Sequence, residues 1–202
     1  MKRRALLLGL LGAPLLARAG AQVEEPLADA IRSALSAAIA RSAPPRPKFE
    51  ANQVDARMAY LRWLGEMSER LKKRKTETQI RIEFLETVWY EAKRAGLEPS
   101  LVLGLIQVES GFRKYAISVA GARGYMQVMP FWTRVIGDGD ASRLFHMQTN
   151  LRFGCVILRH YLDIEKGDLF LALGRYNGSR GRPEYPNAVF AARRQWLLPG
   201  ER

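Results

Sequence analysis

Apolar residues recur at steps of three and four along most of the chain, which is the spacing of one face of an α-helix. No stretch shows sustained alternation of apolar and polar residues, and no two-residue hairpin signal separates two strand-like runs. We therefore expect a mostly α-helical protein. The predicted helices cover 25–41, 49–73, 79–95, a segment that begins at Pro99, 131–136, 150–163, 168–176 and 186–197.

The longest predicted helix, 49–73, carries one apolar stripe and ends in a basic run. Its buried side is predicted to consist of Val54, Met58, Leu61, Leu64, Met67 and Leu71. The run Lys72-Lys73-Arg74-Lys75 follows, where cations complement the helix dipole. A solvated helix end is favoured over a polyanion-binding patch, since such runs usually face water.

The chain begins with a pattern typical of export. A basic start, Met1 to Arg4, precedes about twelve almost wholly apolar residues, too few to cross a bilayer comfortably. Ala19-Gly20-Ala21 then offers small residues three apart, which suits cleavage after about Ala21. We predict a signal peptide over 1–21, favoured over a short membrane anchor, and an exported, periplasmic protein. A helical segment over 22–78, with a Pro-rich linker at 42–47, is expected to follow.

Length and charge set the remaining bounds. The 202 residues suffice for one well-packed domain with an accessory segment. The formal charge of +12 falls to +8 without residues 1–21, which hold four cations and no acid. Anionic cell-wall polymers and membrane headgroups are the partners that this charge favours, and export argues against nucleic acid. The single Cys155 forbids an internal disulfide and is expected to be a buried, inert thiol.

One glutamate stands where a charge is unfavourable. In the run before Glu109, only Gly104 and Gln107 interrupt the aliphatic residues, so Glu109 falls on an apolar helix face. Gly111 marks the end of the helix, where the dipole disfavours negative charge. Both effects raise the pKa of the carboxyl, and glycosidic bond cleavage needs an acid that keeps its proton. A structural carboxylate paired with an arginine, or a helix end facing water, is the alternative.

Three further stretches combine aromatic and amide groups between apolar helices. They are 121–130, Tyr176-Asn177-Gly178 and Tyr185-Pro186. Aromatic faces and amides are the groups that bind sugars. Taken singly, each stretch fits core packing or a helix cap equally well.

Together these stretches resemble the catalytic domain of the soluble lytic transglycosylases, relatives of goose-type lysozyme. The family pattern is Glu-Ser, then Gly-Leu-Met-Gln-aliphatic-Met-Pro, Asn-aliphatic-x-x-Gly and Ala-Tyr-Asn, in that order. Here the motifs read 109–110, 124–130, 150–154 and 175–177, and Tyr185 with Val189 fits a later element. The resemblance covers about 80–197, and four ordered motifs are far more specific than one. Tyr125 stands for the usual Leu and Arg175 for the usual Ala, which is expected to alter the shape of the sugar site.

The resemblance implies a lysozyme-like helical domain over 79–198 that cleaves peptidoglycan glycan strands. It implies that Glu109 first acts as the acid at the β-1,4 bond between N-acetylmuramic acid and N-acetylglucosamine. The same group then acts as a base on the C6 hydroxyl, which leaves a 1,6-anhydromuramoyl end without water, metal or cofactor. Substrate contacts are implied for Ser110, Met126, Gln127, Tyr176, Asn177 and, more weakly, Tyr185.

Two other functions remain open from the sequence. A muramidase would hydrolyse the same bond with water, and a non-catalytic peptidoglycan-binding or secretion-assembly factor would keep the cleft alone. An acid buried at a physical cost argues against a pure binder. Asp138-Gly139-Asp140 is read as a plain loop, because Ser142 and Leu144 occupy the next ligand positions of a calcium loop. A secretion, pilus or other envelope complex is a possible partner that the sequence does not identify.

Overall fold

The computed structural model describes residues 22–40 and 47–200, and these are mostly helical. The predicted signal peptide, and all of the predicted linker except Pro47, lie outside the described residues. The described part holds no β-strand, so the mostly α-helical class is confirmed. Its elements are α1 (Asp29–Ala40), α2 (Val54–Leu71), α3 (Thr78–Arg94), α4 (Pro99–Glu109), α5 (Phe131–Ile136), the 3₁₀ turn η1 (Ala141–Phe145), α6 (Met147–Ile164), α7 (Leu169–Asn177), α8 (Glu184–Arg193) and the 3₁₀ turn η2 (Arg194–Trp196).

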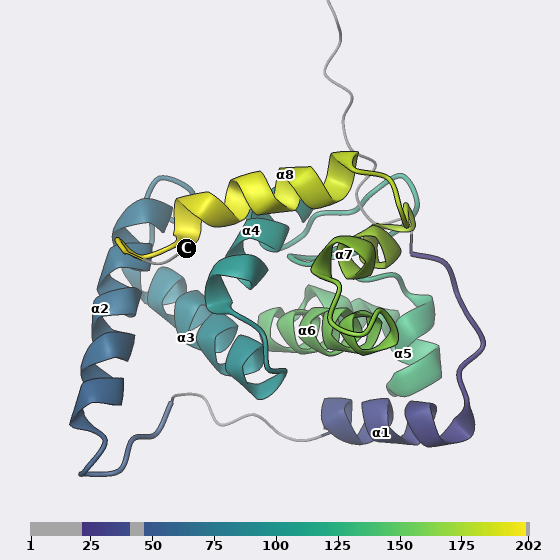
Figure 1. Ribbon diagram of the computed structural model, residues 1–202, viewed down its shortest axis with the longest axis horizontal. Helices are drawn as coiled ribbons and strands as arrows, with labels where there is room; N and C mark the ends of the chain where they lie inside the picture. The colour runs from purple at the N-terminus through teal and green to yellow at the C-terminus, as the bar shows by residue number, and fades with distance from the viewer. Residues whose placement is uncertain (1–21, 41–46, 201–202) are drawn as a thin grey trace, which may run out of the picture.

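Helix α4 is the centre of the fold (Figure 1), with α8 across its top, α2 and α3 to one side, and α6 and α7 to the other. Pro99 stands in its first turn, where the missing N–H costs no helical hydrogen bond. Every residue from Pro99 to Ile106 is buried. At Gly104 an added Cβ would lie 2.7 Å from the backbone nitrogen of Arg193, so only glycine lets α8 pack this closely.

The buried side of α2 differs from the predicted stripe. Val54, Met58 and Leu61 are exposed, and of the predicted set only Met67 and Leu71 are buried, with Leu64 half-buried. The prediction was wrong because aromatic residues decide how this helix packs. Tyr60 and Trp63 are buried and contact the ring of Trp89 on α3, with centroids 5.2 and 4.8 Å apart. Their larger area outweighs that of the aliphatic stripe.

The basic run after α2 is only partly solvated. Lys72 to Arg74 are exposed as expected, but Lys75 is half-buried. Its ammonium lies 4.8 Å from the ring centre of Phe84 and 4.5 Å from that of Tyr125, and it donates a hydrogen bond of 2.7 Å to the Tyr125 hydroxyl. Burial lowers the pKa of Lys75 to about 8. Tyr125, which stands where the motif at 124–130 usually has Leu, thus provides both a ring and a hydrogen-bond acceptor for Lys75.

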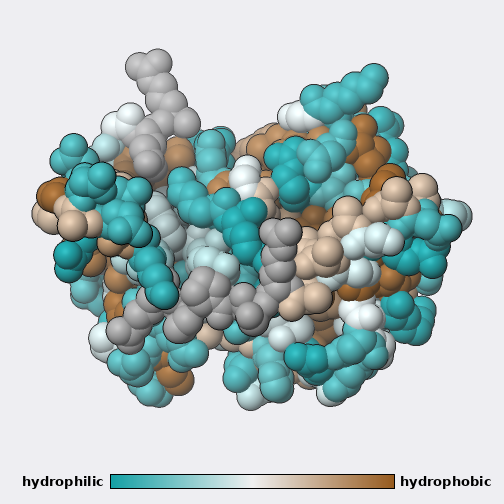
Figure 2. Space-filling view, turned by 90° about the horizontal axis from the view of Figure 1, so that it is seen from below, coloured by the Kyte–Doolittle hydropathy of each residue, from teal (hydrophilic) through white to brown (hydrophobic). Residues whose placement is uncertain are grey.

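Helix α1 is the loosest element. The helix begins at Asp29, later than the predicted start, and none of its residues is fully buried. Seen from below (Figure 2), a pale, weakly apolar stretch of surface lies on the half of the molecule that carries α1. No helix within 22–40 or 47–200 is both long and apolar enough to cross a membrane. Cys155 on α6 is a buried thiol, as expected.

Candidate active site

Glu109 is the last residue of α4, and its side chain is enclosed. The residue is 4 % exposed, and Oε1 accepts a hydrogen bond of 2.5 Å from the Tyr185 hydroxyl at the start of α8. No arginine or lysine of the described residues forms an ion pair with it. Burial raises the pKa of Glu109 to about 8, although the hydrogen bond from Tyr185 acts in the opposite direction. A neutral carboxylic acid, neither paired with a cation nor facing water, therefore ends this helix.

The loop at 123–126 is where the other motifs meet. The Asn150 side chain on α6 accepts from the Met126 N–H at 2.8 Å and donates to the Arg123 carbonyl at 2.8 Å. The Tyr176 hydroxyl on α7 donates to the Met126 carbonyl at 2.8 Å. The motifs on α6 and α7 thus both hydrogen-bond to the same stretch of backbone, which fixes the loop against these two helices.

Two close contacts complete this junction. A Cβ at Gly154 would lie 2.3 Å from the Met126 sulfur, so only glycine fits on this face of α6. The Ser110 hydroxyl, next to the acid, donates to the Tyr125 carbonyl at 2.7 Å. Met126 is therefore held from both sides and is fully buried.

The amide side chains implied as substrate contacts have partners inside the protein. Gln127 is 1 % exposed and donates to the carbonyls of Ala116 and Gly124 at 3.1 and 3.0 Å. Asn177 donates to the Ser179 hydroxyl at 2.9 Å, and its carbonyl oxygen has no hydrogen-bond partner among the described residues. The roles of Ser110, Gln127 and Asn177 in binding substrate remain predictions.

The two tyrosines lie beside the acid. Burial raises the pKa of Tyr176 and of Tyr185 well above the usual value, and a charge on Glu109 would raise both further. Both hydroxyls therefore stay neutral and act as hydrogen-bond donors. Tyr185, the weakest assignment from the sequence, makes the one side-chain hydrogen bond to the carboxyl among the described residues.

One residue at the site gave no signal in the sequence. Gln22 is 4 % exposed, and its Oε1 accepts from the Trp132 indole at 3.0 Å and, at 3.5 Å, from the Met129 N–H. Its amide lies close enough to the Tyr176 hydroxyl to lower that group's pKa against the larger effect of burial. No local pattern singles out a glutamine in a polar segment, so only the folded chain shows this contact.

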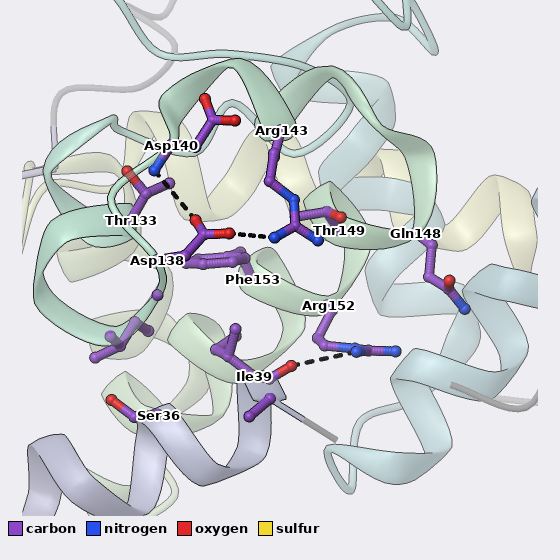
Figure 3. Close-up of a pocket in the computed structure, with 13 residues that line it drawn as sticks. Ser36, Ile39, Thr133, Asp138, Asp140, Arg143, Gln148, Thr149, Arg152 and Phe153 are labelled. Carbon is purple, nitrogen blue, oxygen red and sulfur yellow. Dashed lines mark hydrogen bonds and ion pairs between the residues drawn. The ribbon is translucent and has the colours of Figure 1, made fainter. Parts of the chain in front are cut away.

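A separate hollow of about 620 Å³ lies between α1, α5 and α6 (Figure 3), and Glu109 does not line it. Arg143 forms an ion pair there with Asp138, and Asp140 accepts a hydrogen bond of 2.8 Å from the Ser142 N–H. These contacts stabilise the Asp138–Asp140 turn from within the protein. In the described part of the chain, no group of three or more His, Cys, Asp and Glu side chains is placed to hold a metal ion.

Fold and site together define a helical protein whose central helix ends in a buried, neutral carboxylic acid. A family model, described as the transglycosylase SLT domain, matches residues 86–196. This match spans more than half of the chain, and the chain belongs to the SLT transglycosylase family. The resemblance inferred from the four motifs is thereby confirmed.

Individual relatives agree with this assignment. The chain is 40 % identical over 94 residues to a membrane-bound lytic murein transglycosylase C of Actinobacillus pleuropneumoniae, covering 46 % of this chain and 24 % of that protein. A protein of the same name from Haemophilus influenzae is 48 % identical over 114 residues, 49 % of this chain and 32 % of the relative. A transglycosylase of Enterobacteria phage PRD1 is 31 % identical over 104 residues, which cover 52 % of this chain and 38 % of the phage protein.

Among solved structures, an inactive mutant of the lytic transglycosylase Slt from Pseudomonas aeruginosa is similar to this chain. It is 27 % identical, with a TM-score of 0.43, and the match covers 72 % of this chain and 24 % of that one. The chain thus spans about a quarter to two fifths of the length of these relatives.

Proposed function

We propose that this protein is a lytic transglycosylase that cleaves peptidoglycan glycan strands with Glu109 as its single acid and base. The observation that carries the proposal is the buried carboxyl of Glu109, whose pKa of about 8 leaves it protonated at neutral pH. Such a group is the proton donor that a glycosidic oxygen requires.

The reaction needs two proton transfers through the same carboxyl, the first from Glu109 and the second back to it. Glu109 donates its proton to the oxygen between N-acetylmuramic acid and N-acetylglucosamine as the bond to C1 breaks. The substrate's own N-acetyl group stabilises the cationic centre at C1. The Glu109 carboxylate then removes the proton from the C6 hydroxyl, and O6 bonds to C1 to give the 1,6-anhydro end. The enzyme returns to its protonated state, and no water is consumed.

The surroundings of Glu109 favour a single-carboxylate reaction. Ordinary glycosidases use two carboxylates about 5 to 10 Å apart. Burial raises the pKa of Glu109 and the hydrogen bond from Tyr185 lowers it, and no acidic side chain of the described residues hydrogen-bonds to this carboxyl. Tyr185 keeps its hydrogen bond when Glu109 ionises, because it donates to a carboxylate as readily as to an acid. It therefore stabilises the intermediate ionised state.

A muramidase is the second candidate, since hydrolysis of the same bond would begin with the same acid. The mass of the released fragments distinguishes the two, because the anhydro product lacks one water. The protein without residues 1–21 is incubated with purified sacculi, and soluble fragments are analysed by mass spectrometry. Anhydro ends support the proposal, whereas reducing ends with an added water assign a muramidase.

The acid itself is tested by Glu109→Gln, with Glu69→Gln on the exposed side of α2 as the matched control. Loss of a general acid costs about 10² to 10⁴ in rate. A folded Glu109→Gln protein that keeps more than about a tenth of the wild-type rate contradicts the assignment. If no variant and no wild type releases fragments, the non-catalytic binding factor is the better description.

Location and partners follow from the same proposal. A wall-cleaving enzyme must be exported, which agrees with the predicted signal peptide and a periplasmic location. Relatives named membrane-bound lytic murein transglycosylase C place similar proteins at the cell envelope. The proposed partners are the glycan strands and an envelope or secretion complex.

A further inference from the structure

The segment before α1 runs beside the candidate site. From Gln22 it follows the outer side of α7 and then reaches α1 beneath α5 and α6 (Figure 1, purple). Gln22 is the buried end of this segment, against Trp132, Met129 and Tyr176. Tyr176 is in turn one of the groups that respond to the charge of Glu109. The segment therefore contacts the wall of the site on which the proposed function depends.

Ion pairs fasten this segment to the surface. Glu25 contacts the Arg175 guanidinium at 2.9 and 3.1 Å, and Glu24 lies 3.5 Å from Arg134 on α5. Arg175 stands where the family pattern has alanine, so this anchor belongs to the present chain. The Glu24 and Arg134 side chains are more than half exposed and that of Glu25 is 46 % exposed, and ion pairs at the surface are individually weak.

Little apolar packing holds the segment and α1 in place. Leu27 and Leu35 are only half-buried, and no residue of α1 is fully buried. Hollows of about 620 and 750 Å³ lie on either side of α1, one of them drawn in Figure 3. Elements with few buried apolar contacts open at low free energy. The segment before α1, together with α1 itself, can therefore detach from the surface without unfolding the core around α4.

The described site is closed to a polymer. Glu109, Ser110 and Gln127 are each at most 4 % exposed, and Tyr176 is fully buried. A glycosidic oxygen must come within hydrogen-bond distance of the Glu109 carboxyl, so part of the wall has to move. Of the groups at this wall, Gln22 is on the most weakly held element.

We propose that residues 22–28 form a strap that competes with the glycan for this site. The Gln22 carboxamide presents the same carbonyl and N–H groups as the acetamido group of an N-acetylated sugar, so the two would use the same donors on Trp132 and Met129. Displacement of the strap by a glycan, or by a partner that binds α1, opens the site. The inference rests on the proposed function for its ligand class, and its test is independent of catalysis.

Binding of an uncharged N-acetylglucosamine tetramer measures the competition. The background is Glu109→Gln, so that nothing is cleaved, and the variants are Gln22→Ala and Glu25→Ala. Each removes one strap contact and is expected to lower the Kd of the tetramer about fivefold, because the open state becomes more populated. The matched control is Asp29→Asn, whose carboxylate, among the described residues, forms an ion pair with Arg32 of α1 alone, at 2.6 Å, and it should leave the Kd unchanged.

A second measurement needs no substitution in the strap. Raising salt from about 0.05 to 0.5 M screens exposed ion pairs, and an uncharged ligand makes none of its own. Binding of the tetramer should therefore tighten with salt, and hydrogen exchange of the Met129 amide and of the Trp132 indole N–H, the two donors to Gln22, should quicken.

The outcomes separate the two proposals. Unchanged affinity in both variants and in salt overturns the strap. Weaker binding in Gln22→Ala also overturns it and makes Gln22 part of the glycan site. Tighter binding without lysis in any protein that retains Glu109 keeps the strap and overturns the proposed activity.

Discussion

Replacement of Glu109 by glutamine should stabilise the fold at neutral pH, because the folded protein disfavours a charge at the end of α4. The folded pKa of about 8 lies above the ordinary value of 4.5. Below pH 4.5 both states hold the proton, and the acid has no pH-dependent effect. Between 4.5 and 8 the unfolded chain ionises while the folded protein does not, so stability falls by about 1.4 kcal/mol for each pH unit.

The expected loss is large enough to measure. From about pH 4.5 to pH 7 the wild type should lose about 3 kcal/mol that the Glu109→Gln variant does not lose. For a chain of this length the difference corresponds to about 6 to 12 °C in Tm. Since the glutamine side chain of the variant is never charged, the difference between variant and wild type isolates this one group.

The assay is a set of melting and urea unfolding curves for both proteins at about pH 4.5, 7 and 9. Other titrating groups, Glu91 among them, contribute equally to both proteins and cancel in the difference. A stability difference between the two proteins that is the same at every pH reflects hydrogen-bond geometry and is not evidence for the raised pKa. If the difference shows no dependence on pH, the carboxyl is solvated or paired in solution, and the reasoning from burial is refuted even if Glu109 proves catalytic.

Three further changes test the site. Tyr185→Phe removes the hydrogen bond that lowers the pKa of Glu109, so the alkaline limb of the pH–rate profile, expected near pH 8 in the wild type, should move to higher pH; a shift downward contradicts the assigned contact. Asn177→Ala should slow lysis with little change in Tm if this residue lines the sugar site, whereas lower Tm with normal activity in the cold indicates a helix-end role, and both are measured on one sample. Gly154→Ala places a methyl group against the Met126 sulfur and should lower stability by about 1 to 3 kcal/mol in urea unfolding, while an unaffected protein would show that the loop at 123–126 has room to adjust.

The central helix, α4, could be predicted from its own sequence. The aliphatic run before Glu109 has no polar face, so a helix there can only be buried, and Gly111 marks where it stops. Burial and the raised pKa of the acid follow from that pattern alone. Helix α7 could also be predicted from its sequence, because Asp168 caps its start and Gly178 adopts the left-handed conformation at its end.

The packing of α2 could not be predicted in the same way. Periodicity identifies which residues share a face but gives no weight to the neighbour that each face meets. The predicted face of α2 was its aliphatic stripe, but Trp89 on α3 packs against Tyr60 and Trp63 and so decides which side of α2 is buried. Lys75 was misassigned for a similar reason, because its aromatic partners lie outside α2 and the basic run that follows it, Phe84 on α3 and Tyr125 in the loop at 123–126.

By itself, then, the sequence determined the helical class, the acid at the end of α4 and the four motifs, because each depends on residues within one or two turns of each other. Only the tertiary structure decided what those residues touch. It placed Tyr185 on the carboxyl, 76 residues away along the chain, and Gln22 on Trp132, 110 residues away. Contacts at such separations depend on how the helices pack around α4, and no local pattern of apolar and polar positions encodes that packing.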